Sequence, residues 1–518
     1  MPLNRALRAV PLVMAACLAV VAFGARSAAQ ADAAEARTAR AFNEARSEGP
    51  LALHAFFYRM PKGGDLHVHL TGAVYAETWI AEAAEDGICV NAKQLSFDSA
   101  HYAPGCPAGE MPASGVPANQ HLYDELVDAF SMRTFIPVTG DSGHDHFFAT
   151  FDRFGDDNRF IGNWIDEVAS RAAAQNEQYL ELMQTGNYAG AKAAAAKIGW
   201  DPNLAEFRDR LLADPDFRAN VQSARSAFDA ALRQRNAIEH CGAADAAPAC
   251  RVTVRFLYQV LRDNPPQQVF AQTLLGFEIA SSDPNVVGIN FVQPEDDYFS
   301  MRDYRLQMHM LDTLHCVYPK VHISLHAGEL APGMVPPEGL TFHIRLAVEE
   351  GHAERIGHGV DVMYEDHPWQ LMKEMADRHV MVEINLTSNA VILGVTGDEH
   401  PFMLYRKMGV PVALSTDDEG VSRIDLTHEY VRAADTYPLS YRDLKSMVRT
   451  SIEHSFLPGA SLWETVTPEK LEIAVSACRE QLGADSPRGP CATLIHRSEK
   501  AQQEWELERR FHAFESSF

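Results

Sequence analysis

The sequence predicts an α/β fold in which eight parallel strands and their helices form a (β/α)8 barrel of the TIM type. From residue 251 onward, apolar segments alternate with helix-like ones: "RVTVRFLYQVL" precedes "PPQQVFAQTLLGFEIAS", and "NVVGINFV" precedes "DYRLQMHMLDTLHCV". Apolar strands that alternate with helices are typical of a parallel sheet. With "DLHVHL" and "YLELMQ" as the first two strands, the chain holds about eight strand–helix units, the number found in a barrel.

An open, doubly wound sheet is the alternative arrangement of the same elements. Such folds commonly bind nucleotides through a glycine-rich fingerprint or a phosphate-binding loop. The sequence contains neither pattern, and this favours the barrel.

The N-terminus has the pattern of a secretory signal peptide. Arg5 and Arg8 precede an apolar run over residues 9–24, and small residues that suit cleavage follow, for example at Ala29. A membrane anchor would need about 20 apolar residues, and lipid attachment at Cys17 conflicts with the apolar run that continues past it. We therefore expect an exported protein, periplasmic or secreted, that has no membrane attachment after cleavage.

The chain then divides into an extension, a barrel and a C-terminal part. After the signal peptide (1–29), residues 30–59 are rich in Ala, Glu and Arg and predict a helical extension. The barrel is expected over residues 60–430. An insertion at 88–150, rich in Pro, Gly and Ser, interrupts it after the first strand and predicts irregular structure. Residues 431–518 predict helices that pack on the barrel.

Seven cysteines follow the signal peptide, and export would place them in an oxidising compartment. Six of them lie in three close pairs, each around a loop-like stretch, which predicts three local disulfides. The pairs are Cys89 with Cys106, Cys241 with Cys250, and Cys478 with Cys491. We expect the remaining cysteine, Cys316, to be a buried thiol.

The chain carries 70 acidic and 45 basic residues, a formal net charge of −25 that is spread along its length. Nucleic acids and anionic membranes bind basic patches, so neither is expected as a main partner. A small or neutral substrate remains compatible with this charge. The 46% of hydrophobic residues is sufficient for a large core.

Polar residues with metal-ligand and acid–base chemistry stand at the ends of four predicted strands. His67 and His69 end "DLHVHL", where strand alternation puts both side chains on one face. The C-terminal ends of barrel strands form the catalytic face, so a shared site explains these residues better than four separate structural roles. The other strand-end residues are His326 in "SLHAGE", His358 in "RIGHG", and Asp417 with Asp418 in "STDD".

Two other histidine groups are interpreted as structural. His144 and His146 repeat the His-x-His spacing, but they lie in the glycine-flanked insertion and not on an apolar strand, so we expect a loop. His309 and His315 lie in a helix-like segment, where surface or packing roles are expected.

The donor types at the strand ends indicate zinc. Three neutral imidazoles and one carboxylate, with no thiolate, suit a single Zn²⁺ ion that keeps a position open for water. Water bound in this way is a strong nucleophile near neutral pH. The candidate ligands are His67, His69, His326 and Asp417.

Three further residues would supply the rest of a hydrolytic reaction at a C–N bond. Glu329 lies just past His326, where it would face the substrate and protonate the nitrogen. His358 would orient the water or stabilise charge during the attack. Asp418 would accept a hydrogen bond from the substrate or orient the water.

The blocks "PKGGDLHVHLTGA", "SLHAGE", "RIGHGVDV" and "ALSTDD" resemble, in order and spacing, the adenosine deaminase family of metal-dependent amidohydrolases. The resemblance spans roughly residues 60–430, and the exported, extended chain looks most like the secreted adenosine deaminase-related branch. It implies a zinc-binding (β/α)8 barrel that converts adenosine to inosine and ammonia. By matched position it implies zinc ligands at His67, His69, His326 and Asp417, a proton donor to purine N1 at Glu329, assistance of the attack at C6 by His358, and a contact to N7 from Asp418.

Two positions depart from the family pattern, and both concern substrate recognition. Thr71 stands where the cytosolic enzymes have an aspartate that contacts the ribose, so ribose recognition is expected to differ. "INFVQPE" matches the family block "FDLAGDE", and Gln293 replaces the glycine whose amide meets purine N3. A glutamine still offers its N–H, although Pro294 stiffens the loop that follows.

The sequence therefore predicts an exported zinc aminohydrolase that acts on a purine nucleoside, adenosine or 2′-deoxyadenosine. Deamination of another 6-aminopurine, such as adenine or a 5′-modified adenosine, is the alternative within enzymes. AMP is less favoured because no basic cluster adjoins the motifs. A non-catalytic nucleoside-binding or signalling protein is the third possibility, although Glu329 and all four ligand positions are present.

Overall fold

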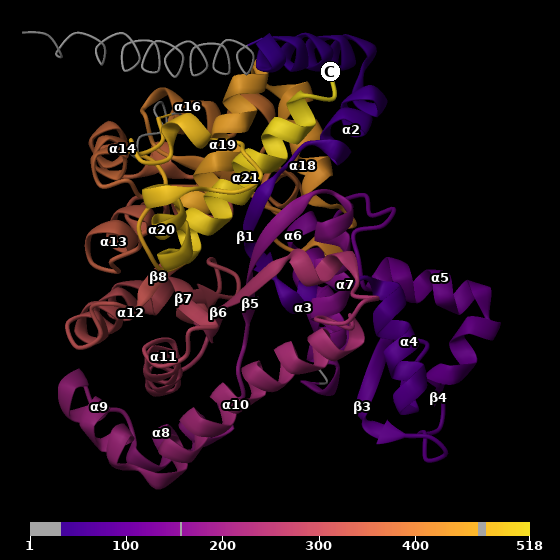
Figure 1. The fold of residues 1–518 in the computed structure, drawn as a ribbon. Helices are drawn as coiled ribbons and strands as arrows, with labels where there is room; N and C mark the ends of the chain where they lie inside the picture. The colour runs from indigo at the N-terminus through magenta and orange to yellow at the C-terminus, as the bar shows by residue number, and fades with distance from the viewer. Residues whose placement is uncertain (1–32, 156–157, 465–472) are drawn as a thin grey trace, which may run out of the picture.

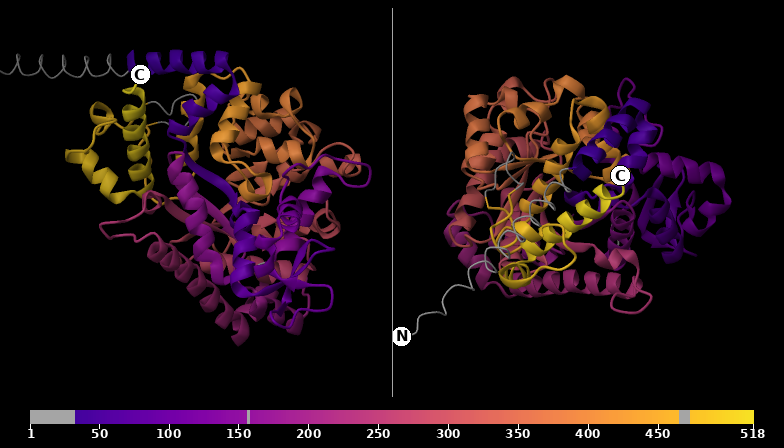
Figure 2. Two further views of the ribbon diagram at one scale, coloured as in Figure 1. Left: turned by 90° about the vertical axis from the view of Figure 1, so that its right-hand side faces the viewer. Right: turned by 45° about the horizontal axis from the view of Figure 1, so that its top comes forward.

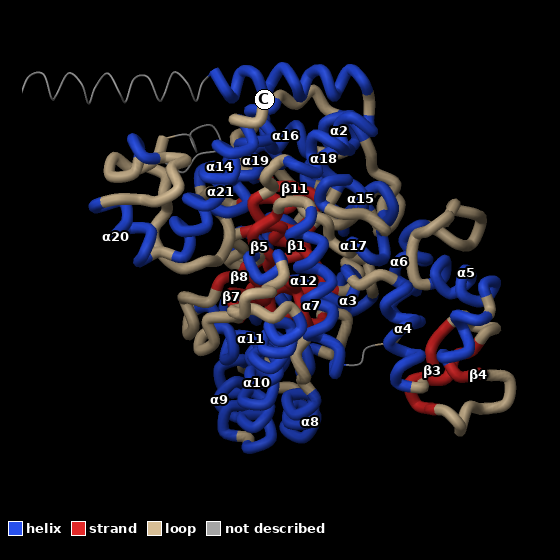
Figure 3. The backbone as a smooth tube through the Cα atoms, turned by 45° about the vertical axis from the view of Figure 1, so that its right-hand side comes forward, coloured by secondary structure: helices blue, strands red, loops and turns tan. Residues whose placement is uncertain are grey.

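The computed structural model describes residues 33–155, 158–464 and 473–518, so the predicted signal peptide lies outside the described residues. Eight parallel strands form one sheet, drawn in red in Figure 3, in which neighbours in space are also neighbours in the chain. The strands are β1 (Gly63–His69), β5 (Glu177–Gln184), β6 (Thr253–Leu261), β7 (Val286–Val292), β8 (His322–Ala327), β9 (Arg355–His358), β10 (Met381–Ile384) and β11 (Val412–Leu414).

The sheet closes on itself where the residues after β11 meet β1. Asp417 forms a parallel bridge to Val68. Its N–H donates to His67 O at 2.8 Å, and its carbonyl accepts from His69 N at 3.0 Å. Nearby, Thr416 donates from both its N–H and its hydroxyl to a buried carboxylate oxygen of Asp65 on β1. This closure confirms the predicted barrel over the open sheet.

Helices surround the strands, which lie in the middle of the molecule in Figure 3. Every residue of β5 is buried, including the polar residues Glu177, Gln178, Glu181 and Gln184. This agrees with a parallel barrel strand that is covered on both faces. The helices up to β6 are α2 (Pro50–Arg59), α3 (Leu70–Ala73), α4 (Ala76–Asp86), α5 (Gln120–Ala129), α6 (Gly143–Phe154), α7 (Ile161–Ala174), α8 (Ala189–Ile198), α9 (Leu204–Ala213) and α10 (Pro215–Ile238). Those that follow are α11 (Pro266–Ala280), α12 (Tyr298–His315), α13 (His343–Glu349), α14 (Pro368–Asp377), α15 (Leu386–Ile392), α16 (Phe402–Lys407), α17 (Glu419–Ser422), α18 (Leu426–Thr436), α19 (Tyr441–Glu453), α20 (Gly489–Arg497) and α21 (Glu499–Glu515).

The N-terminal extension is helical, as predicted, but it forms two helices. Residues 33–48 are helical, and α2 begins at Pro50 after Gly49, whose φ of 102° breaks the helix. Phe56 of α2 packs edge-on against Phe514 of α21. The two ends of the described chain therefore lie side by side, as both views in Figure 2 show.

The insertion after β1 is more regular than predicted. It contains a small antiparallel sheet, β3–β2–β4, and the helix α5, which project beside the barrel in Figure 1. Its second helix, α6, lies against the barrel and contacts α15. The loop expected around His144 and His146 is wrong, because both lie in α6. Ser142 caps this helix by accepting a hydrogen bond from Asp145 N at 3.0 Å, and Phe147 is buried on its inner face. The strands are β2 (Ile88–Asn91), β3 (Ser96–Tyr102) and β4 (Met111–Pro112).

The three predicted disulfides form: Cys89–Cys106, Cys241–Cys250 and Cys478–Cys491. The prediction for Cys316 is wrong. It is exposed, because it lies at the C-terminal end of α12, where the helix leaves the core. Among the helices that the structure describes, none is long and apolar enough to cross a membrane.

Candidate metal centre and active site

Four side chains from three parts of the barrel meet at the C-terminal ends of its strands. His67 and His69 lie at the end of β1, His326 lies in β8, and Asp417 follows β11. The ligand atoms of all four lie within 4.8 Å of one another. Nε2 of His69 is 3.1 Å from Nε2 of His326, and Asp417 Oδ1 is 3.3 Å from Nε2 of each β1 histidine. The group is consistent with a single metal site.

Each of the three imidazoles is oriented by a hydrogen bond at Nδ1. The bonds are His67 to Glu383 Oε2 at 2.6 Å, His69 to Gln259 Oε1 at 2.6 Å, and His326 to Asn290 Oδ1 at 2.8 Å. All three partners are oxygen acceptors, so each Nδ1 carries the proton and each Nε2 turns a lone pair toward the shared point. Nε2 of His67 is buried and has no hydrogen-bond partner among the described residues. The donor set therefore fits a metal ion.

The charges at this point attract a cation. Burial alone would lower the pKa of His67, but the carboxylates of Asp417, 3.3 Å from its Nε2, and of Glu383 raise that pKa to about 10. Burial and the neighbouring imidazoles hold the pKa of His326 well below its ordinary value. The neighbouring carboxylates also raise the pKa of His69, so the group attracts positive charge, for which a proton and a metal ion compete.

Three residues of the site have left-handed backbone conformations, although none is glycine. The φ angles are 84° at Gln293, 72° at His358 and 65° at Asp417. Such conformations cost about 1 kcal/mol or more each and cluster at functional sites. The backbone strain therefore coincides with the predicted catalytic face.

Glu329 lies in the loop after β8, and a second carboxylate holds that loop. Glu295 accepts hydrogen bonds from the backbone N–H of Gly328 at 3.1 Å and of Glu329 at 2.8 Å, and it contacts His343 Nδ1 at 2.5 Å. Burial, together with the charges of Asp417 and Glu295, raises the pKa of Glu329 well above its ordinary value. This shift favours the protonated form of the Glu329 carboxyl.

His358 ends β9 and turns Nε2 toward the same space. This atom is 3.6 Å from Glu329 Oε1 and 3.8 Å from Asp417 Oδ2, and it has no hydrogen-bond partner among the described residues. Burial lowers the pKa of His358 to about 3. A neutral imidazole is therefore available to a group bound between these three side chains.

Asp418 follows the metal group and has a buried oxygen, Oδ1, without a partner in the described part of the chain. Burial is the largest cause that raises its pKa well above the ordinary value, and the charge of Asp417 adds to this. The side chain comes so close to α3 that a Cβ on Gly72 would lie 1.6 Å from Asp418 Oδ1. Gly72 therefore leaves the space that Asp418 occupies.

A cavity of about 420 Å³ opens over these groups. Gln293 lines it, and the Gln293 side-chain oxygen accepts a hydrogen bond from Asp263 N at 2.9 Å. Thr71 lies in α3, half-buried, and is not among the lining residues. The residues that line the cavity are His69, Phe147, Phe148, Phe151, Asp152, Gln259, Leu261, Val292, Gln293, Pro294, Asp297, His326, Glu329, Ile392, Asp417 and Asp418.

An apolar wall of the cavity was missed from the sequence. Phe147, Phe148 and Phe151 of α6 form it. α6 packs tightly on α15, since a Cβ on Gly143 would lie 1.9 Å from Val391 O. The spacing of the phenylalanines over "GHDHFFATFDRF", behind the cap at Ser142, is the signal that predicts such a helix.

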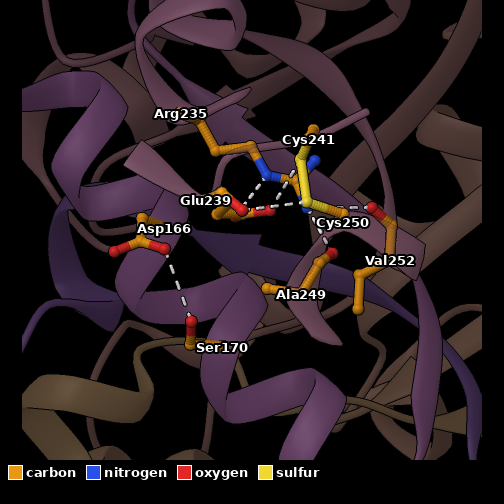
Figure 4. Close-up of a disulfide and its surroundings, with 8 residues drawn as sticks. All are labelled: Asp166, Ser170, Arg235, Glu239, Cys241, Ala249, Cys250 and Val252. Carbon is orange, nitrogen blue, oxygen red and sulfur yellow. Dashed lines mark hydrogen bonds and ion pairs between the residues drawn. A yellow bond between two sulfur atoms is a disulfide. The ribbon is translucent and has the colours of Figure 1, made fainter. Parts of the chain in front are cut away.

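A second group with metal-binding residue types is a disulfide site. Glu239, Cys241 and Cys250 lie within ligand distance of one another, but the two sulfurs are bonded to each other, as Figure 4 shows. Glu239 is paired with Arg235 at 2.5 Å in the same view. This group therefore braces the end of α10 against the chain that leads into β6.

Comparison with known proteins agrees with this arrangement. Residues 219–464 match the adenosine deaminase family. The adenosine deaminase of Clostridium perfringens is 35% identical over 135 residues, which are 26% of this chain and 37% of that protein. The adenosine deaminase of Escherichia coli is 36% identical over 137 residues, which are 26% of this chain and 38% of that protein. The chain thus spans little more than a third of the length of the curated relatives it matches.

Solved structures are similar over more of the chain. An Arabidopsis N6-mAMP deaminase has a TM-score of 0.51 at 22% identity, covering 78% of this chain and 96% of that one. An amidohydrolase from Burkholderia ambifaria, solved with bound Zn, has a TM-score of 0.50 at 18% identity, covering 78% and 88%. At these identities the likeness shows that the barrel fold is shared.

Proposed function

From the match of residues 219–464 to the adenosine deaminase family, we propose that the protein is a zinc-dependent hydrolase that deaminates adenosine or 2′-deoxyadenosine to inosine or 2′-deoxyinosine and ammonia. The observation that carries the proposal is the position of Glu329 beside the four-residue metal group. A buried carboxyl with a raised pKa, next to a set of three imidazoles and a carboxylate, combines a proton donor with a place for a Lewis acid.

His67, His69, His326 and Asp417 would hold the zinc ion. When bound, zinc supplies Lewis-acid activation of water at neutral pH. Gln259 on β6, Asn290 on β7 and Glu383 on β10 bind the Nδ1 atoms of the three histidines and keep the imidazoles in place. The site therefore needs little rearrangement to bind the ion.

The remaining residues would act on the purine and on the attacking oxygen. Glu329, protonated, would donate to purine N1 and make C6 more electrophilic. His358 would contact the oxygen that attacks C6. Asp418, whose raised pKa favours its protonated form, would donate a hydrogen bond to N7. Gln293 would contact the purine edge from the opposite side of the cavity.

The cavity supports an uncharged nucleoside over a nucleotide. Among the described residues that line it, none is Lys or Arg, whereas Asp152 and Asp297 are acidic. A 5′-phosphate would meet negative charge without a paired cation. The phenylalanines of α6 provide a face for a planar base or for an apolar 5′ substituent, so a 5′-modified adenosine stays the second candidate.

We also propose that the protein is exported and belongs near the secreted adenosine deaminase-related branch. The three disulfides support this, because such bonds persist in oxidising compartments.

Ultraviolet absorbance during incubation with adenosine, 2′-deoxyadenosine, adenine, AMP and a 5′-modified adenosine tests the substrate. We expect turnover of the two nucleosides, with AMP far slower. Elemental analysis should give about one zinc per chain. Failure on every compound by a zinc-loaded protein would overturn the deaminase proposal and favour a binding protein.

A further inference from the structure

A chain of hydrogen bonds leads from the back of His358 into the protein. His358 Nδ1, which faces away from the cavity, lies 2.9 Å from Asn389 Nδ2. Asn389 Oδ1 lies 3.0 Å from His400 Nε2, and His400 Nδ1 lies 3.1 Å from the backbone nitrogen of Phe402. Asn389 belongs to α15, Phe402 is the first residue of α16, and His400 lies two residues before it. His358, Asn389 and His400 are all buried.

The last link determines the direction of every other link. The backbone N–H of Phe402 can only donate, so His400 Nδ1 must accept and carries no proton. A neutral His400 then has its proton on Nε2, which donates to Asn389 Oδ1. This orients the Asn389 amide, and its NH2 group must donate to His358 Nδ1. A neutral His358 therefore carries its proton on Nε2, toward the cavity.

Two further observations agree with this direction. Burial and the charge of Arg432 lower the pKa of His400 to about 4, which keeps it neutral at physiological pH. Asn385 Nδ2 also lies near His358 Nδ1, at 3.4 Å, as a second and longer donor contact. A proton on His358 Nε2 would point toward the carboxyl oxygens of Glu329 and Asp417, which can accept a hydrogen bond.

We propose that Asn389 and His400 are positioning residues that hold His358 in the tautomer with its proton on Nε2. This inference rests on the proposed function for its catalytic meaning. In this tautomer His358 presents an N–H donor and no lone pair to the attacking oxygen. His358 thus stabilises negative charge on that oxygen and does not take a proton from it at Nε2. The relay explains why the His400 side chain is buried at the start of a short helix.

The tautomer is measured directly on the zinc-loaded, full-length protein without substrate. Long-range ¹H–¹⁵N correlation spectra of protein labelled with ¹⁵N-histidine distinguish a protonated ring nitrogen from a bare one. The His358 signals are identified by their loss in His358→Ala. We expect a protonated Nε2 and a bare Nδ1. A proton on Nδ1 would overturn the proposal.

Three substitutions at two positions test the relay through the reaction. Asn389→Leu removes the donor to His358 Nδ1, and we expect kcat to fall about 10- to 100-fold with KM changed less than twofold, since a wrong tautomer weakens catalysis and not binding. His400→Leu should give a smaller loss in the same direction. His400→Gln keeps a donor group and should restore kcat to within a few-fold of the wild type.

His454→Gln is the matched control, because His454 is a partly buried histidine at the opposite end of the strands, beside Arg355 and Val380. It should leave kcat and the His358 signals unchanged. An equal loss of kcat in this variant, or wild-type kcat in Asn389→Leu, would contradict a positioning role. If the wild type carries the Nε2 proton but deaminates no substrate, the relay is confirmed and the proposed function is overturned.

Discussion

Glu383 Oε2 lies 2.6 Å from His67 Nδ1, and both side chains are completely buried inside the barrel. Glu383 is held in turn by Arg355 Nε at 2.7 Å and by Ser324 Oγ at 3.0 Å. A carboxylate that is fixed on its far side fixes the imidazole, and with it the direction of the His67 Nε2 lone pair. The geometry of the metal group therefore depends on residues one layer deeper in the barrel.

Glu383→Gln should weaken zinc binding about 10- to 100-fold without unfolding the barrel, because the amide is a poorer acceptor for His67 Nδ1. Competition against a chromophoric chelator measures the affinity. Glu354→Gln is the matched control, since Glu354 pairs with His322 at 2.8 Å on the surface. Equal zinc affinities in the wild type and both variants would show that Glu383 does not tune the site.

Glu329→Gln should retain zinc but lower kcat by about 10²- to 10⁴-fold, the range in which a general acid contributes. The amide keeps the shape of the side chain and cannot supply the proton. Steady-state kinetics and elemental analysis on the same preparation separate these effects. Wild-type turnover by a zinc-loaded Glu329→Gln would remove this residue as the proton donor.

Removal of zinc by a chelator should abolish deamination, and rebinding near pH 7.5 should release about one proton per chain. The reason is that the pKa of His67 is about 10 before the ion binds, so the ion must displace a proton. Isothermal titration in buffers with different heats of ionisation counts the protons. A binding heat that does not depend on the buffer would contradict this assignment.

The protein should lose stability as the pH falls from about 6.5 toward 4, in part through His400. Burial first, and Arg432 second, lower the pKa of His400 from 6.5 to about 4 in the folded state. Between these values the unfolded chain binds a proton that the folded chain does not, so acid favours unfolding. At pH 5 this amounts to about 2 kcal/mol for one group.

Urea denaturation at pH 7 and pH 5, in the wild type and in His400→Gln, isolates this contribution. The variant lacks the titrating ring, so its free energy of unfolding should fall by about 2 kcal/mol less between the two pH values. Identical pH dependence in the two proteins would mean that His400 does not carry the effect.

Phe148→Ala should raise KM for adenosine about fivefold and leave kcat nearly unchanged, since it removes roughly 1 kcal/mol of apolar contact from the cavity wall. Phe135→Ala serves as the control: Phe135 stacks on His146 in the same insertion and does not line the cavity. A similar rise of KM in both variants would point to a general loosening of the insertion.

The barrel could be predicted because most of its strands contain apolar, largely buried runs between helices. The disulfides could be predicted because the cysteines of each pair lie close together in the sequence. The metal group could be predicted because its residues stand at strand ends. The residues that bind the histidine Nδ1 atoms could not be predicted from the sequence. Gln259, Asn290 and Glu383 are single polar residues on other strands, and no local sequence pattern relates them to the histidines. α6 was missed because its glycine and histidines conceal an amphipathic helix.

The closure of the barrel has a consequence for biosynthesis. His67 and His69 lie on the first barrel strand to be made, whereas Asp417, which bridges to that strand and completes the metal group, follows the last. A nascent or truncated chain that lacks the last strand and the residues after it has three of the four donors. It also lacks the bridge between Val68 and Asp417 that closes the barrel. Binding of the metal by all four donors therefore requires a chain that has been made as far as the residues after the last strand.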